Sequence, residues 1–166
     1  MRTLIIIPVL LSALLLGVPS HTADFNRGMT AYNNGDYATA LREWTSVIEK
    51  GFKEEGYVKT LYNLGQMHRY GKGVPQDYYL SSLWFNLAAE QGDANSQHNL
   101  GIAYYKGEGV IQDLVYSHMW VNIAMSNGHN RAKEELEIIE NKMTPSQIEE
   151  AQKLARECVK KNYKGC

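Results

Sequence analysis

An internal repeat with an offset of 36 residues is the feature that most constrains the fold of this chain. Leu64-Gly65 recurs as Leu100-Gly101. Other matched pairs are Gly71 and Gly107, Gly73 and Gly109, Asp77 and Asp113, Trp84 and Trp120, Ala88 and Ala124, and Gly92 and Gly128. A shorter copy precedes them and contains Gly28, Gly35, Ala40, Trp44 and Gly51. Tandem copies of this length predict similar structural units that stack side by side and share one core.

Each copy is predicted to form two helices joined by a turn. Apolar residues follow helical spacing in two segments, at Leu80, Leu83, Trp84, Leu87 and Ala88 and at Tyr116, Met119, Trp120, Ile123 and Ala124. Asp77 and Asp113 stand directly ahead of these segments as N-caps, and Gly92 and Gly128 end them. The preceding helices, expected over 58–70 and 94–106, end in Gly-x-Gly-Val turns. The repeating unit is therefore a helical hairpin.

Glycines inside the predicted first helices indicate close packing within each hairpin. Gly65 and Gly101 each cost about 1 kcal/mol relative to alanine at a helix interior. We expect the missing side chain to let the second helix approach and seat its tryptophan there. Trp44, Trp84 and Trp120 are accordingly predicted to be core wedges between hairpins.

Residues 1–23 are predicted to be a removable signal peptide. Arg2 precedes an uncharged apolar run from Leu4 to Val18 that is short for a membrane span. Cleavage after Ser20 or after Ala23 fits, and an uncleaved anchor is the alternative. We expect an exported bacterial protein, periplasmic or secreted, without stable membrane insertion after cleavage.

Charge gives no electrostatic case for a nucleic-acid partner. Lys and Arg number 17 and Asp and Glu number 18, for a formal charge of -1. A chain with this balance lacks the basic surplus that phosphate backbones or anionic membranes attract.

The motif Leu-Gly-x-x-(Tyr/His)-x-x-Gly-x-Gly-Val-x-x-Asp, followed by Trp, Ala and Gly, resembles the Sel-one-like repeat family, which is related to the tetratricopeptide repeats. The resemblance is strong over residues 60–130, and the first copy is closer to the tetratricopeptide register. It implies an all-α fold, a right-handed superhelical α-solenoid of about eight helices. The implied organisation is a solenoid over 24–161, with repeats 24–59, 60–93 and 94–130, capping helices in 131–161, and a tail over 162–166.

A last helix is expected to close the stack. Thr144 and Gln147 form a capping-box signature, with Pro145 at the first helical position. The apolar stripe of this helix comprises Ile148, Ala151, Ala155, Cys158 and Val159. Cys158 and Cys166 either form a disulfide or leave Cys158 as a small core residue, and the sequence leaves both open.

Motifs for chemistry are missing from the sequence. The five histidines form no His-x-x-x-His pair, and no Cys-x-x-Cys occurs, so no metal site is predicted. The Gly-x-Gly turns lack the preceding strand and third glycine of a phosphate-binding loop. We predict no catalytic residue and no cofactor.

A partner-binding groove is implied by analogy with tetratricopeptide repeats, whose first helices line the concave face. The corresponding residues are Phe25, Met29, Tyr32, Asn33, Lys59, Tyr62, Gln66, Arg69, Asn95, His98, Ile102 and Tyr105. These residue types suit recognition of an extended peptide. We therefore expect a monomeric, non-enzymatic adaptor for a protein or peptide partner. The alternative is an envelope hydrolase that acts on peptidoglycan or β-lactams, as some cysteine-rich relatives suggest.

Overall fold

The computed structural model describes residues 25–51, 53, 54 and 56–166, and over these the fold is all-α. The predicted signal peptide, residues 1–23, lies outside the described residues. The helices are α1 (Phe25–Asn33), α2 (Tyr37–Lys50), α3 (Tyr57–Tyr70), α4 (Tyr78–Ala89), α5 (Ala94–Lys106), α6 (Leu114–Ser126), α7 (Ala132–Glu140) and α8 (Pro145–Lys160). Eight helices and no strand in the described part confirm the predicted all-α fold class.

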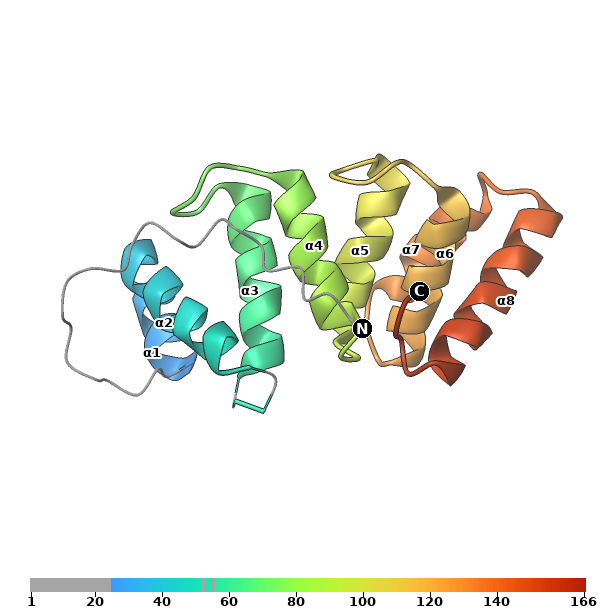
Figure 1. Ribbon diagram of the computed structural model, residues 1–166. Helices are drawn as coiled ribbons and strands as arrows, with labels where there is room; N and C mark the ends of the chain where they lie inside the picture. Colours follow the sequence, from blue (N-terminus) through green and yellow to red (C-terminus); the bar gives the residue numbers. More distant parts are fainter. Residues whose placement is uncertain (1–24, 52, 55) are drawn as a thin grey trace.

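The helices follow one another along an elongated stack in the order of the sequence (Figure 1). The pairs α1 and α2, α3 and α4, and α5 and α6 each form a hairpin, and helix α4 also packs against α5. Helices α3, α5 and α7 run in the same direction (Figure 1). Helix α8 packs against α6 and covers the last end of the stack.

The repeated aspartates and glycines mark the helix boundaries as predicted. The Asp77 carboxylate accepts a hydrogen bond from the Leu80 amide at 2.9 Å, and Asp113 accepts from the Tyr116 amide at 3.0 Å. Gly71 and Gly107 end α3 and α5 in the left-handed region, with φ of 65° and 72°. Equivalent residues thus perform the same task in both repeats.

The three tryptophans lie in the core between hairpins, as predicted. Trp44, Trp84 and Trp120 are all buried. Trp84 joins the cluster that contains Trp44, Leu61 and other residues of the preceding hairpins. Trp120 joins the next cluster, where α8 also contributes.

The predicted seating of the tryptophans on Gly65 and Gly101 is wrong, because Gly65 faces Phe85 and Gly101 faces Val121. In the first copy, for which no seating was predicted, Gly28 does face the Trp44 ring. Phe85 and Val121 each follow a tryptophan in sequence, and neighbouring residues on a helix point about 100° apart. One side chain therefore enters the gap between hairpins while the next packs against its own hairpin partner.

Two residues assigned to apolar stripes lie at the surface. Leu87 on α4 is 36% exposed and Val159 on α8 is 46% exposed. The buried face of α4 instead comprises Ser81, Ser82, Trp84, Phe85, Ala88 and Ala89. Small side chains on this face permit the close approach of α3, since Ser81 Oγ donates to the Gly65 carbonyl at 2.9 Å.

The C-terminal tail is tied back onto the solenoid. Cys158 and Cys166 form a disulfide, and Cys158 is also buried in the core, so both features that the sequence left open occur together. Thr144 and Gln147 form the predicted capping box at the start of α8. Tyr163 lies against Gly92 and donates its hydroxyl hydrogen to Asn127 at 3.2 Å.

Candidate functional site

A groove of about 450 Å³ lies between α3, α5 and α7. Helix α3 contributes one wall, α5 the floor, and α7 with the turn before it the other wall. The lining residues are Tyr62, Arg69, Tyr70, Asn95, His98, Asn99, Ile102, Tyr105, Lys106, His129, Arg131, Glu135, Ile138 and Ile139. The groove is thus lined by aromatic, aliphatic, amide and charged side chains together.

The floor is one face of α5. Asn95, His98, Asn99, Ile102 and Tyr105 follow spacings of three and four residues, which place them in a row on a helix. The opposite face of α5 packs closely against α6, because a Cβ at Gly101 would meet the Val121 side chain at 2.6 Å. Packing behind the helix therefore holds the row toward the groove.

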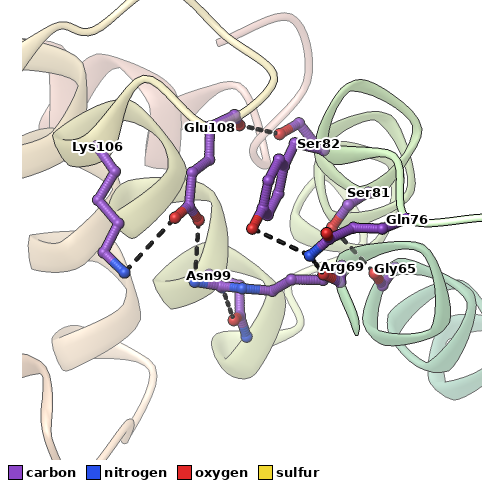
Figure 2. Close-up of polar contacts among 9 residues, drawn as sticks. Gly65, Arg69, Gln76, Ser81, Ser82, Asn99, Lys106 and Glu108 are labelled. Carbon is purple, nitrogen blue, oxygen red and sulfur yellow. Dashed lines mark hydrogen bonds and ion pairs between the residues drawn. The ribbon is translucent and has the colours of Figure 1, made fainter. Parts of the chain in front are cut away.

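Arg69 connects the α3 wall to the floor and to the turn after α5. Its Nη1 donates to Asn99 Oδ1 at 2.8 Å, and its Nη2 donates to Glu108 Oε2 at 3.2 Å. Figure 2 shows Lys106 approaching the same Glu108 carboxylate from the other side, at 3.6 Å. The Glu108 carbonyl accepts from Ser82 Oγ at 2.9 Å, which holds that turn against α4. One carboxylate is therefore shared by two cations at this end of the groove.

The α7 wall meets the floor through two histidines and a carboxylate. His98 Nε2 donates a hydrogen bond to Glu135, because an ionised carboxylate can only accept. Arg131 lies 3.8 Å from the other Glu135 oxygen. The His129 ring stacks on His98, with centroids 3.9 Å apart and planes 13° apart.

Burial keeps these two imidazoles uncharged near neutral pH. Burial lowers the pKa of His98, and the neighbouring Glu135 carboxylate opposes this only in part. Burial and then the adjacent His98 lower the pKa of His129. The fixed charges of the groove therefore come from Arg69, Lys106 and Arg131 against Glu135.

Half of the twelve residues predicted for the groove line it. They are Tyr62, Arg69, Asn95, His98, Ile102 and Tyr105. The other six, Phe25, Met29, Tyr32, Asn33, Lys59 and Gln66, do not.

Contacts within the first hairpin and its neighbour occupy most of the second group. Phe25 and Tyr32 pack against Trp44, with ring centroids 6.4 and 5.6 Å apart. Met29 Sδ accepts a hydrogen bond from Asn63 at 3.2 Å. The Lys59 ammonium lies 5.8 Å from the Phe25 ring centre. These side chains serve the α1 to α3 junction.

The repeat motif fades after residue 130, so no residue of the α7 wall was predicted for the groove. The offset of 36 residues could have found part of it, since Arg131 is equivalent to Asn95 and Glu135 to Asn99. Ile138 follows the predicted groove residue Ile102 by the same offset, so the repeat length indicates it as well. His129 and Lys106 correspond to Asp93 and Tyr70, which were not predicted for the groove, so the offset gives no signal for them.

The described residues contain no group of three His, Cys, Asp or Glu side chains that could hold a metal ion. Over the same part of the chain, none of the helices has the length and apolar character required to cross a bilayer.

Comparison with known proteins identifies the repeats. The Sel1 repeat family matches residues 58–93 and 94–129. A protective antigen present in uropathogenic Escherichia coli strains, described as displaying an SLR fold, is 28% identical with a TM-score of 0.73 over 83% of this chain and 30% of that one. A Sel1 repeat protein from Oxalobacter formigenes is 25% identical with a TM-score of 0.59 over 68% of this chain and 44% of that one. This chain therefore spans less than half the length of either protein. No curated protein matches it.

Proposed function

Because this chain is an α-solenoid built around two Sel1 repeats, we propose that it is an exported, non-enzymatic adaptor that binds a protein or peptide partner in the groove between α3, α5 and α7. The groove itself carries the proposal. It places tyrosines, asparagines and Ile102 beside fixed charges on one hollow surface, a mixture typical of protein recognition.

The dimensions of the groove suit an extended peptide. Helix α5 has 13 residues, which corresponds to a floor of about 20 Å. An extended chain rises about 3.3 Å per residue, so about six residues would lie along it. The exposed Asn95 offers its side-chain amide along this path to a peptide backbone, whereas the Asn99 amide is already bonded to Arg69 and to the Asn95 carbonyl.

The N-terminal pattern and the disulfide support export. An apolar run after Arg2 is typical of a signal peptide. The Cys158–Cys166 bond belongs to an oxidising compartment such as the bacterial periplasm or the exterior.

The hydrolase alternative receives no support from the relatives or from the groove. The described lining residues include no serine, threonine or cysteine nucleophile, and Glu135 is the single carboxylate among them, so the groove lacks the pair of carboxylates that most glycoside hydrolases use. Recognition without turnover is therefore the better account of this surface.

Site-directed photocrosslinking tests the proposal. The residue p-benzoylphenylalanine would replace Ile102 in the groove or, as a control, Ile111, which is 90% exposed in the turn after α5. Both variants would be expressed in a bacterium that exports them, and the cells would then be irradiated. We expect a discrete protein or peptide adduct from position 102 and none from position 111.

A second pair of variants locates the contact. Combined Tyr62→Ala and Arg69→Ala substitution should abolish the adduct at position 102, as should Asn95→Ala with Ile138→Ala, two exposed residues whose loss leaves the core intact. Circular dichroism checks that each variant is folded. Equal labelling from positions 102 and 111, or an adduct that survives both substitutions, would refute groove binding. Turnover of a cell-wall substrate that depends on a groove residue would favour the hydrolase instead.

A further inference from the structure

Cations outnumber carboxylates in the groove. Arg69, Lys106 and Arg131 line it, whereas Glu135 is its only lining carboxylate among the described residues. The entire chain carries a formal charge of -1, so this surplus is local to the groove.

The available carboxylates are already shared. Glu108, at the edge, contacts both Arg69 at 3.2 Å and Lys106 at 3.6 Å. Glu135 accepts from His98 and lies 3.8 Å from Arg131. Each carboxylate is thus shared by two neighbouring N–H donor groups. The cations therefore keep further N–H donors that could bond a carboxylate of a ligand.

The three groove cations differ in how exposed their side chains are. The side chains of Lys106 and Arg131 are 49% and 78% exposed, so a ligand can reach them without disturbing the fold. Arg69 is only 14% exposed and is held by Asn99 and Glu108, which use two of its five N–H donors. Arg69 is therefore a fixed donor, and the other two are adaptable ones.

The cations flank an apolar centre. Helices α5 and α7 run in the same direction, so Lys106 at the end of α5 and Arg131 before α7 lie toward opposite ends of the groove (Figure 1). Ile102 lies between these ends on the floor, and Ile138 on the α7 wall is 53% exposed beside the groove. An apolar ligand side chain would cover these isoleucines.

We propose that the groove selects an extended peptide segment in which carboxylate side chains flank apolar ones. This inference rests on the proposed peptide-binding function. The acidic side chains lie against Arg131 at one end and against Arg69 and Lys106 at the other. Apolar side chains lie on Ile102 and Ile138. Such a segment satisfies the charge surplus and covers the exposed aliphatic surface at the same time.

Three fluorescein-labelled hexapeptides test this chemistry by fluorescence anisotropy with the purified chain. They have the form X-X-Leu-Leu-X-X, where X is aspartate, asparagine or lysine, so each face of the extended chain carries a leucine flanked by two X residues. The aspartate and asparagine peptides differ in charge but hardly in shape. At about 25 mM NaCl we expect the aspartate peptide to bind about tenfold more tightly than the asparagine peptide, and the lysine peptide to bind least. At about 250 mM NaCl the advantage of aspartate should shrink to a few-fold.

Matched charge-removal variants test the location. Lys106→Gln with Arg131→Gln removes two exposed groove cations, and we expect the preference for aspartate over asparagine to fall within about threefold. Lys153→Gln with Arg156→Gln removes two exposed cations from α8, outside the groove, and should leave the preference unchanged. Loss of preference in the α8 variant as well would show a general charge effect and overturn the assignment.

The crosslinking residue at position 102 separates this inference from the proposed function. Equal binding of the aspartate and asparagine peptides, both crosslinked at position 102, would overturn the acidic preference and leave groove binding intact. Failure of all three peptides to bind would also overturn it, while a cellular adduct at position 102 would still support an adaptor.

Discussion

Gly65→Ala is expected to destabilise the fold although alanine is the better helix former. Gly65 lies inside α3 against the buried Phe85 ring of α4, and an added Cβ would lie 2.6 Å from Phe85 Cε1 and 2.7 Å from Cδ1. Favourable carbon–carbon contacts are about 3.5–4.0 Å, so the ring or a helix must move by about 1 Å. The hydrogen bond from Ser81 Oγ to the Gly65 carbonyl ties the two helices at this point and opposes that movement.

Two opposing terms set the magnitude. Inserting a methyl group into a well-packed core costs about 1–3 kcal/mol, and a buried ring between tied helices belongs in the upper half of that range. Replacing a helical glycine with alanine raises the free energy of unfolding by about 1 kcal/mol through the better helix propensity of alanine. The free energy of unfolding should therefore fall by about 1–2 kcal/mol, which lowers Tm by about 3–8 °C in a chain of this size.

A double-mutant cycle with Phe85→Leu tests the cause. Urea unfolding followed by circular dichroism would give the free energy of unfolding for the parent, both single variants and the double variant. Because leucine lacks the ring that crowds position 65, Gly65→Ala in the Phe85→Leu background should be neutral or stabilising by up to about 1 kcal/mol. The same loss in both backgrounds would refute crowding by Phe85, and a gain in the parent background would refute the packing argument altogether.

Three further predictions concern the C-terminal cap and the histidines. Thr144→Ala removes the capping box of α8 and should lower the free energy of unfolding by about 1 kcal/mol in urea titrations, with no effect if the helix end is already frayed. Reduction of the Cys158–Cys166 disulfide should lower it by about 2.5 kcal/mol from the loop-closure entropy, whereas a Cys158→Ala and Cys166→Ala variant should be insensitive to reductant. Because the pKa values of His98 and His129 are lowered in the folded chain, the unfolded chain binds more protons between those values and about 6.5. Stability should thus be full above about pH 6.5 and fall as pH drops through that window. Replacement of both histidines with Gln should weaken this dependence and leave the contribution of His68, whose pKa is also lowered by burial, and an unchanged pH profile would contradict the assignment.

The sequence predicted the helices well because their boundary signals are local. Asp77 and Asp113 cap helices whose first turns lie beside them in sequence, and Thr144 does the same for α8. The choice between Trp84 and Phe85 as the residue that meets Gly65 was not local. It depends on the rotation of α4 about its axis, which is set by contacts with two other hairpins.

Only part of the groove lining was predicted, because the recognisable repeats supply only part of the groove. Tyr62, Arg69, Asn95 and Ile102 follow the spacing of first helices in recognisable repeats. The α7 wall belongs to a segment without the repeat motif, so the analogy was not extended to it, although the 36-residue offset relates Arg131 to Asn95 and Ile138 to Ile102. The first-copy residues do not line this groove, because the aromatic rings of α1 pack on Trp44.

Positions that agree between the two Sel1 repeats build the solenoid, and positions that differ give the groove its chemistry. The same structural roles recur in both repeats: close helix contact at Gly65 and Gly101, and core packing at Trp84 and Trp120. Lys72 and Glu108 occupy equivalent turns and both reach back to the preceding hairpin, but Lys72 donates to the Tyr32 hydroxyl and Glu108 accepts from Arg69.

The same contrast holds for the charges of the groove. Lys106 stands where the previous repeat has Tyr70, and Arg131 follows Asn95 by one repeat length. Exchanging such residues changes the charge of the groove. The buried contacts between hairpins persist, because neither the Lys106 side chain nor the Arg131 side chain enters the core. A solenoid of this kind can therefore alter the ligand it selects at little cost to its stability, which is why Lys106 and Arg131 are the residues on which the acidic-peptide inference is best tested.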